Sequence, residues 1–223
     1  MSGTCIIVTG GDPLHPRTAD RLPSGARVLA ADSGLDHADA LGLDVDLVLG
    51  DLDSVTKEAL DAARRRGIPV EEHPAAKDQT DLELAIDAAA AGGADHIVVV
   101  SGGGGRLDHL LGGLLALAAP VHTAAGTPVA VEAIVGSAWV AALHGPGHQA
   151  LRGRPGELLT LLAVGGPADG VRTEGLRYPL HGERLLPGSG RGISNELLGT
   201  DAAVSVGSGS LLVVQPEALE VPA

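Results

Sequence analysis

The sequence predicts an α/β protein: an amino-terminal, mostly parallel sheet flanked by helices, followed by a smaller carboxy-terminal all-β domain. Two observations carry this prediction. Up to about residue 136, short apolar runs alternate with helical patterns, as expected of stacked βα units. After that point, glycines and prolines separate short apolar runs, which is typical of closely spaced strands. We therefore expect an α/β domain over residues 1–136 and a smaller all-β domain over residues 137–223.

The individual elements follow from hydrophobic periodicity and from the residues that end it. Apolar residues three and four positions apart indicate helices, and two of these patterns stop at glycines, Gly67 and Gly92. Short continuous apolar runs indicate buried strands. The expected strands are residues 5–8, 28–31, 47–49, 68–70, 97–100, 139–143, 158–164, 204–206 and 211–214, and the expected helices are residues 55–66, 81–91 and 107–118.

Composition excludes several classes of protein. With 44% hydrophobic residues the chain has enough apolar material for packed cores, and its single cysteine, Cys5, excludes an internal disulfide and a multi-cysteine metal site. The formal net charge of -13 disfavours binding to nucleic acid or to anionic lipid. The longest charge-free apolar stretch, residues 110–121, is too short to span a membrane, and the amino terminus lacks a signal-peptide pattern. We expect a cytoplasmic protein with no nucleic-acid or membrane partner.

Polar residues gather where the predicted parallel strands end. Ligands of open α/β sheets bind beyond the carboxyl ends of the strands, so the segments 31–34, 50–54 and 101–109 are expected to share one rim. Asp51 and Asp53 are two positions apart in what begins as an extended segment, so both carboxylates would face one side and could hold a hard cation. Each carboxylate also has a simpler explanation. Asp53 or Ser54 could cap the next helix, residues 80–83 fit a capping box, and Asp108 would be favoured by a helix dipole alone.

The four glycines at 102–105 match neither of the standard nucleotide-binding glycine patterns. Consecutive glycines nevertheless allow backbone N–H groups to approach phosphate oxygens, with Arg106 as a cation and a helix N-terminus behind them. The alternative is a flexible connector between a strand and a helix. His144 and His148 are assigned to loops, because Gly145-Pro146-Gly147 would break a helix that placed them on one face.

Six sequence blocks follow one another along the chain: Ala31-Asp32-Ser33-Gly34, Gly50-Asp51-Leu52-Asp53-Ser54, Lys77-Asp78-Gln79-Thr80-Asp81, Gly105-Arg106-Leu107-Asp108-His109, Gly175-Leu176-Arg177-Tyr178-Pro179-Leu180 and Ile193-Ser194-Asn195-Glu196. In order and approximate spacing, these blocks together resemble the thiamine pyrophosphokinase family. The resemblance spans nearly the whole chain and both predicted domains. It implies an α/β catalytic domain and a β-sandwich domain in a homodimer with the thiamine site near the subunit interface. The implied reaction transfers diphosphate from ATP to thiamine and releases AMP.

The resemblance also implies roles for single residues. Asp51, Asp53 and Asp81 would hold Mg²⁺ against the phosphates of ATP, with Asp32 supporting that cluster or the nucleotide. Asp108 would receive or orient the proton of the thiamine hydroxyl. Ser33 and Leu52 depart from the family's usual Gly and Phe. The remaining expected nucleotide-site residues are Lys77, Thr80, Gly104, Gly105 and Arg106, and the expected thiamine-site residues are Tyr178, Ser194 and Asn195.

Three other functions fit part of this pattern. Residues 47–55 also resemble the first motif of haloacid-dehalogenase-type phosphatases, although the rest of that motif set is missing. A diphosphokinase acting on another alcohol, such as a hydroxymethylpterin, would keep the same metal cluster and change the acceptor. A nucleotide-sensing module would bind ATP without turnover, but such a module has no need for so many carboxylates.

Overall fold

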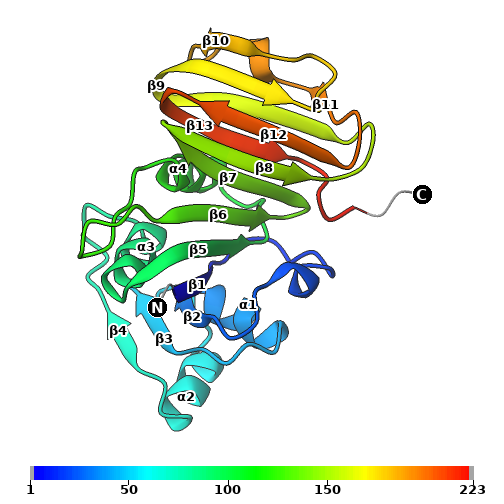
Figure 1. The fold of residues 1–223 in the computed structure, drawn as a ribbon. Helices are drawn as coiled ribbons and strands as arrows, with labels where there is room; N and C mark the ends of the chain where they lie inside the picture. Colours follow the sequence, from blue (N-terminus) through cyan, green and yellow to red (C-terminus); the bar gives the residue numbers. More distant parts are fainter. Residues whose placement is uncertain (1–2, 221–223) are drawn as a thin grey trace. The chain divides into compact units, whose positions relative to one another are not determined.

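The computed structural model describes residues 3–220, and the chain divides into two compact units (Figure 1). Unit 1 comprises residues 3–116 and 120–136 of the described chain, and unit 2 comprises residues 117–119 and 137–220. Unit 1 combines a sheet with helices and unit 2 is rich in strands. The fold class predicted from the sequence, an α/β part followed by a β-rich part, is confirmed.

Unit 1 is built on a parallel sheet. Its strand order is β4-β3-β2-β1-β5-β6, and every neighbouring pair in it is parallel. Ile6 of the central strand is in register with Val28 on one side and Val98 on the other, and all three side chains are buried. The strands are β1 (Gly3–Val8), β2 (Arg27–Ala31), β3 (Leu47–Gly50), β4 (Val70–Glu72), β5 (Ala94–Ser101) and β6 (Ala130–Val135).

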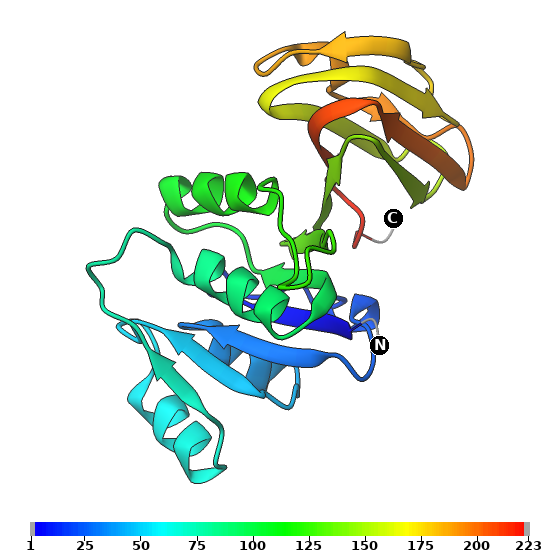
Figure 2. The same cartoon turned by 60° about the vertical axis from the view of Figure 1, so that its left-hand side comes forward.

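Helices cover both faces of this sheet (Figure 2). Alternate strand residues face opposite sides, so Ile6 and Val98 pack in one core cluster with Leu35 of α1 and Ala63 of α2. Helix α3 lies along the other face, against β1, β2, β3 and β5. The helices are α1 (Gly34–Ala40), α2 (Lys57–Arg65), α3 (Asp81–Ala91) and α4 (Leu107–Leu117), with a short 3-10 turn, η1, at Ala19–Arg21.

Local differences from the expected elements have simple causes. Helix α2 begins two residues later than predicted because Thr56 is its N-cap and accepts a hydrogen bond from the Ala59 N–H. The strand expected at 68–70 lies at Val70–Glu72 and is mostly exposed. Helix α1 and strand β6 were not predicted. Helix α1 is only seven residues long, and β6 alternates buried Val131 with partly exposed Glu132 rather than forming a continuous apolar run.

Unit 2 is an antiparallel arrangement around the long strand β9. The strand order is β7-β13-β9-β12-β8, and β10 and β11 pair with other parts of β9. Its core contains Leu159, Leu161, Leu211 and Val213. The elements are β7 (Ala138–His144), β8 (Gly147–Arg152), β9 (Leu158–Glu174), β10 (His181–Leu185), η2 (Gly190–Gly192), β11 (Asn195–Glu196), β12 (Asp201–Val206) and β13 (Ser208–Gln215).

The loop assignment of two histidines was wrong. His144 ends β7, with its Nδ1 atom 2.8 Å from the Ser210 hydroxyl, and His148 lies in β8 opposite Ser205. The segment Gly145-Pro146-Gly147 does break a helix, as expected, but it turns the chain between β7 and β8, and each of these strands carries one of the two histidines.

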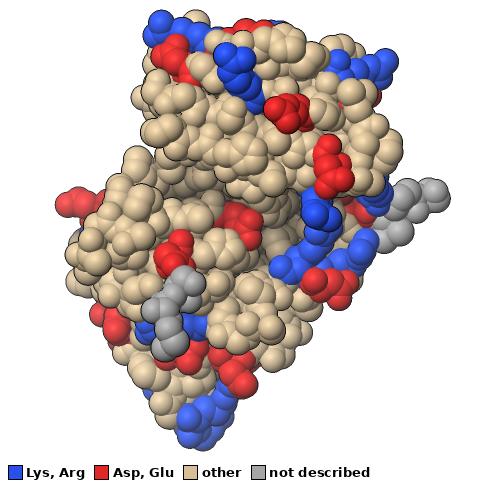
Figure 3. Space-filling view, in the orientation of Figure 1, with Lys and Arg blue, Asp and Glu red and all other residues tan. Residues whose placement is uncertain are grey.

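Charged side chains are dispersed on the face drawn in Figure 3, where lysines and arginines are mixed with acidic residues over a mainly uncharged surface. Within residues 3–220, no helix is both long and apolar enough to cross a bilayer.

Candidate functional site

The residues predicted to bind nucleotide lie on loops at one edge of the unit 1 sheet. Asp32 follows β2, Asp51 follows β3, and residues 102–105, which we call the glycine loop, follow β5. Because these strands are parallel, their carboxyl ends meet at the same edge. The shared rim expected from the sequence is therefore present in the fold.

Three carboxylates on this rim form a compact group, which we call the acidic triad: Asp32, Asp51 and Asp53. One oxygen from each lies within 4.8 Å of the other two. The segment between Asp51 and Asp53 is not extended as the sequence analysis assumed, because Leu52 has a left-handed backbone with φ 60°. The Leu52 side chain packs against the core cluster of α1 and α2 described above. Asp51 and Asp53, on either side of it in the chain, are not part of this cluster.

The donor set of the triad fits a hard divalent cation. The Ser54 hydroxyl donates a hydrogen bond to Asp32 Oδ2, whereas Asp32 Oδ1 is buried without a hydrogen-bond partner among the described residues. The negative charges of Asp51 and then Asp32 raise the pKa of Asp53. Carboxylate oxygens are the ligands that Mg²⁺ and Ca²⁺ prefer, and a bound cation would relieve this repulsion.

Asp81 lies beside the triad but has a different partner. Lys77 Nζ is 3.1 Å from Asp81 Oδ1 and 3.3 Å from Asp51 Oδ2, so one ammonium group bridges the two carboxylates. Partial burial lowers the pKa of Lys77, but the contacts with Asp81 and Asp51 outweigh it and the net pKa is raised. The family resemblance implied that Asp51, Asp53 and Asp81 would hold the cation. In the structure Asp32 is the third member of the compact group.

Thr80 is engaged in capping helix α3. Its hydroxyl accepts a hydrogen bond from the Glu83 N–H at 3.2 Å, and its own N–H donates to the Glu83 carboxylate at 2.8 Å. These two bonds form the capping box considered in the sequence analysis. Thr80 thereby fixes the first turn of α3, which carries Asp81.

The glycine loop adopts backbone angles that favour glycine. Gly103, Gly104 and Gly105 all have positive φ, between 61° and 69°. The Ser101 hydroxyl accepts a hydrogen bond from the Gly103 N–H at 3.2 Å and donates one to the Gly10 carbonyl at 3.2 Å. Gly104 and Gly105 are exposed. A loop held at its base and open at its tip is compatible with backbone binding of an anion.

Arg106 and Asp108 bind one another. Two hydrogen bonds, Nε to Oδ1 at 3.1 Å and Nη2 to Oδ2 at 2.6 Å, join side chains that are both largely exposed. The Arg106 guanidinium lowers the pKa of Asp108 to about 2. Asp108 is consequently an ionised and weakly basic carboxylate in this arrangement.

Asp12 also lies at this edge of the sheet, although it was not predicted from the sequence. It lies in the loop that follows β1, and its N–H donates to the Gly103 carbonyl at 2.9 Å. Gly10, Gly11 and Asp12 come directly after the first predicted strand, so the rule applied to the other strand ends would have identified this segment too.

In unit 2, Asn195 and Tyr178 are tied together. The buried Asn195 amide accepts from the Tyr178 N–H at 3.0 Å and donates to the Tyr178 carbonyl at 2.8 Å. The Tyr178 ring is half exposed, and the Arg177 guanidinium carbon lies 5.8 Å from its centroid. Ser194 is exposed, with a left-handed backbone and its N–H bound to Thr160.

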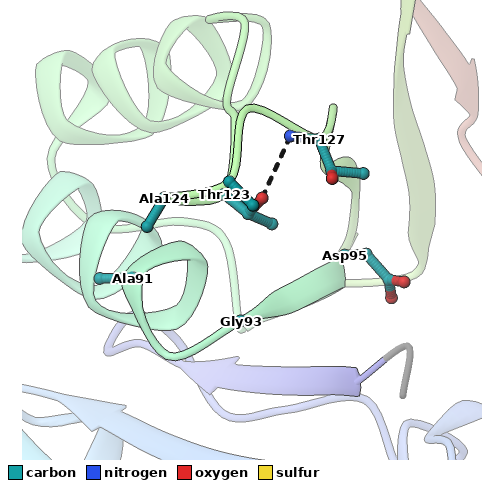
Figure 4. Close-up of a pocket in the computed structure, with 7 residues that line it drawn as sticks. Ala91, Gly93, Asp95, Thr123, Ala124 and Thr127 are labelled. Atoms are coloured by element: carbon teal, nitrogen blue, oxygen red, sulfur yellow. Dashed lines mark hydrogen bonds between the residues drawn. The ribbon is translucent and has the colours of Figure 1, made fainter.

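A hollow of about 460 Å³ lies at the other end of β5 (Figure 4). Asp95, at the start of that strand, lines it together with Gly93, which follows α3, and with the loop in which Thr127 donates to the Thr123 hydroxyl. No residue predicted for the site lines this hollow. The hollow and the acidic triad lie at opposite edges of the sheet. Strand β5 begins near Asp95, at the hollow, and ends at Ser101, on the rim that carries the triad.

Two family models match the chain in separate segments. The model described as thiamin pyrophosphokinase, catalytic domain, matches residues 21–127. The model described as thiamin pyrophosphokinase, vitamin B1 binding domain, matches residues 148–212. The first segment lies in unit 1 except for residues 117–119, the second lies wholly in unit 2, and together they cover more than half of the chain.

Individual relatives agree with these models. The chain is 25% identical over 186 residues to a thiamine pyrophosphokinase of Bacillus subtilis, covering 82% of this chain and 85% of that protein. A crystal structure of thiamine pyrophosphokinase from Bacillus subtilis superposes with a TM-score of 0.80 at 25% identity, covering 95% of this chain and 98% of the other. A thiamin pyrophosphokinase from Candida albicans, with a TM-score of 0.74 and 13% identity over 95% of this chain and 88% of the other, shows the shared fold.

Proposed function

The chain belongs to the thiamine pyrophosphokinase family, and from this premise we propose that it transfers the terminal diphosphate of ATP to the hydroxyl of thiamine, giving thiamine diphosphate and AMP. The observation that carries the proposal is the acidic triad on the same sheet edge as the glycine loop. A cation-binding group beside a loop open to anions is the combination that a metal-bound polyphosphate requires.

The metal would be Mg²⁺, held by Asp32, Asp51 and Asp53. The buried Asp32 oxygen that lacks a hydrogen-bond partner within residues 3–220 supports this assignment, and Asp81 would act beside it through the shared Lys77. When bound, the metal supplies positive charge that offsets the charge of the phosphates. Lys77 in turn would hold Asp51 and Asp81 in place through its contacts with both carboxylates.

The phosphate oxygens would be bound by backbone N–H groups of the glycine loop, by Lys77 and by Arg106. In the transfer, the thiamine hydroxyl oxygen forms a bond to the β-phosphorus, and the bond from that phosphorus to the oxygen of the leaving AMP breaks. Positioning and electrostatic stabilisation supply most of the acceleration in such transfers. The hydroxyl proton leaves to a nearby acceptor, and Asp108, held by Arg106, would orient the hydroxyl without being an effective base for its proton.

Thiamine would be recognised by residues of unit 2. Half of the Tyr178 surface is exposed, which leaves an aromatic plate available to a ring of thiamine, and the Ser194 hydroxyl is available for a polar edge. Asn195 serves this site by holding the main chain of Tyr178. We also expect a homodimer with the thiamine site near the subunit interface. Light scattering of the purified protein tests whether it is a dimer.

The deciding experiment incubates the purified protein with Mg²⁺, ATP and thiamine and identifies the products by mass spectrometry. We expect thiamine diphosphate and AMP in equal amounts, and neither when thiamine or Mg²⁺ is left out. Asp51→Asn should abolish the reaction. The matched control Asp61→Asn removes a carboxylate from helix α2, outside the acidic triad, and should retain it.

Other products would contradict the proposal. Thiamine monophosphate with ADP would mean transfer of a single phosphoryl group. Phosphate release that does not depend on thiamine would favour a phosphatase, and AMP formation only with a hydroxymethylpterin would favour a different acceptor.

A further inference from the structure

The loop after β1 is interlocked with the glycine loop. Asp12 donates its N–H to the Gly103 carbonyl at 2.9 Å, and the Ser101 hydroxyl donates to the Gly10 carbonyl at 3.2 Å. Strands β1 and β5 are neighbours, so the two loops leave the sheet side by side. The contacts continue that pairing beyond the strands.

Asp12 also determines which residues fit into the glycine loop. A side chain at Gly102 would collide with the Asp12 carbonyl, which belongs to the main chain and cannot swing away. A side chain at Gly104 would collide with the Asp12 carboxylate, so that carboxylate packs directly on Gly104. Asp12 thus contacts three consecutive glycines, two through its main chain and one through its side chain.

We propose that Asp12 is a positioning residue that holds the glycine loop in the arrangement that binds polyphosphate. This inference rests on the proposed function of the loop. Gly103, Gly104 and Gly105, which have positive φ, can adopt many other backbone conformations. A loop that samples these conformations loses conformational entropy when a ligand binds, and this loss weakens binding. The packing of the Asp12 side chain against Gly104 removes part of that freedom in advance.

The charge of Asp12 makes this role distinguishable from an electrostatic one. Its carboxylate is exposed beside a loop that would bind an anion, so its charge alone would weaken binding. Asn has nearly the same shape as Asp and no charge. A positioning role therefore predicts that Asp12→Asn preserves binding and Asp12→Ala weakens it, whereas a purely electrostatic role predicts that both variants strengthen it.

The test measures binding of inorganic tripolyphosphate in the presence of Mg²⁺ by calorimetry, together with the KM values for ATP and thiamine. We expect Asp12→Ala to weaken tripolyphosphate binding and raise the ATP KM about tenfold, because small misplacements of binding groups have effects of this size or larger. The thiamine KM should stay unchanged, and Asp12→Asn should restore wild-type values to within about twofold. The matched control is Asp20→Ala, which removes an exposed carboxylate from η1 in the same β1–β2 connection.

Hydrogen exchange provides a readout that does not depend on activity. Peptides covering residues 101–106 should exchange faster in Asp12→Ala than in the wild type, while peptides from α2 should not change. Equal binding by Asp12→Ala and the wild type would overturn the inference, as would tighter binding by both variants. If the wild type binds tripolyphosphate but makes no thiamine diphosphate, the proposed reaction fails and the role of Asp12 is still decided by these measurements.

Discussion

Arg106, the residue that follows the glycine loop, donates two hydrogen bonds to the Asp108 carboxylate, and the shorter of them, from Nη2 to Oδ2, is 2.6 Å long. The pair unites the cation proposed to bind phosphate with the carboxylate proposed to orient the hydroxyl. The guanidinium lowers the pKa of Asp108 to about 2, so this carboxylate is ionised at every pH at which the protein would be assayed. A base of such low pKa accepts a proton poorly near neutral pH.

Replacing Asp108 by Asn should therefore lower kcat by less than about tenfold, since the variant loses orientation of the hydroxyl but no effective base. The acidic limb of the pH profile of kcat should lie at the same pH in Asp108→Asn as in the wild type. Steady-state kinetics of the wild type and Asp108→Asn across pH checks both expectations. A loss of about 10² or more in kcat would instead make Asp108 the general base, with its pKa changed when substrates bind.

Leu52 should matter for metal binding although it offers no ligand atom. Its side chain packs on the core cluster while its left-handed backbone separates Asp51 from Asp53. Leu52→Ala removes the anchor, so we expect Mn²⁺, used as a probe for Mg²⁺, to bind about tenfold more weakly. Paramagnetic titration of Mn²⁺ measures this affinity.

Val55→Ala is the matched control for this prediction, because Val55 also packs partly buried against the same cluster. Both variants should lower the free energy of unfolding, by about 1–3 kcal/mol for partly buried side chains. Equal loss of Mn²⁺ affinity in the two variants would mean that general loosening of the core, and not the Leu52 anchor, is responsible.

Much of the fold was predictable because the core strands of unit 1 are continuous apolar runs. Residues 5–8, 28–31, 47–49 and 97–100 all lie in parallel strands, as expected. Strand β6 escaped prediction because Glu132 interrupts its apolar pattern, where it pairs with His96 across the sheet. Periodicity in one segment cannot reveal a partner that lies more than thirty residues away.

The candidate site was predictable to the level of its loops and not to the level of its contacts. The rule about strand ends brought Asp32, Asp51 and Asp53 to one rim. The left-handed turn at Leu52 and the bridge from Lys77 to Asp81 depend on packing beneath the rim and on the capped start of α3. Asn195 was expected at the thiamine site, and the hydrogen bonds of its amide to the Tyr178 main chain depend on tertiary structure.

Substitutions of Asn195 and Tyr178 should differ in their effect on stability while both weaken thiamine binding. Asn195→Ala leaves the Tyr178 N–H and carbonyl without their partner in a part-buried position, so we expect the free energy of unfolding to fall by about 2–4 kcal/mol. Tyr178→Ala removes a half-exposed ring and should cost little stability. Both should raise the thiamine KM and leave the ATP KM nearly unchanged. Equal rises in both KM values for Tyr178→Ala would indicate a folding defect.

His96 should make the stability of unit 1 depend on pH. Its Nε2 atom lies 3.2 Å from Glu132 Oε1 on the neighbouring strand, and this hydrogen bond raises the pKa of His96 in spite of partial burial, with smaller contributions from the charges of Glu132 and Asp95. A histidine whose pKa is higher in the folded state binds its proton more tightly there. Its stabilising contribution is complete below 6.5, the ordinary pKa, and is lost as the pH rises through the raised value.

We therefore expect the free energy of unfolding of the wild type to fall between about pH 5.5 and about pH 8.5 by more than that of His96→Gln or Glu132→Gln. The difference should stay below about 1 kcal/mol, because more than a third of the His96 side chain is exposed to solvent. Urea unfolding at a series of pH values measures it. Glu132→Gln keeps the imidazole but removes its anionic partner, so a pH dependence that survives in this variant would have to come from the remaining effect of Asp95 on His96 or from another titrating group.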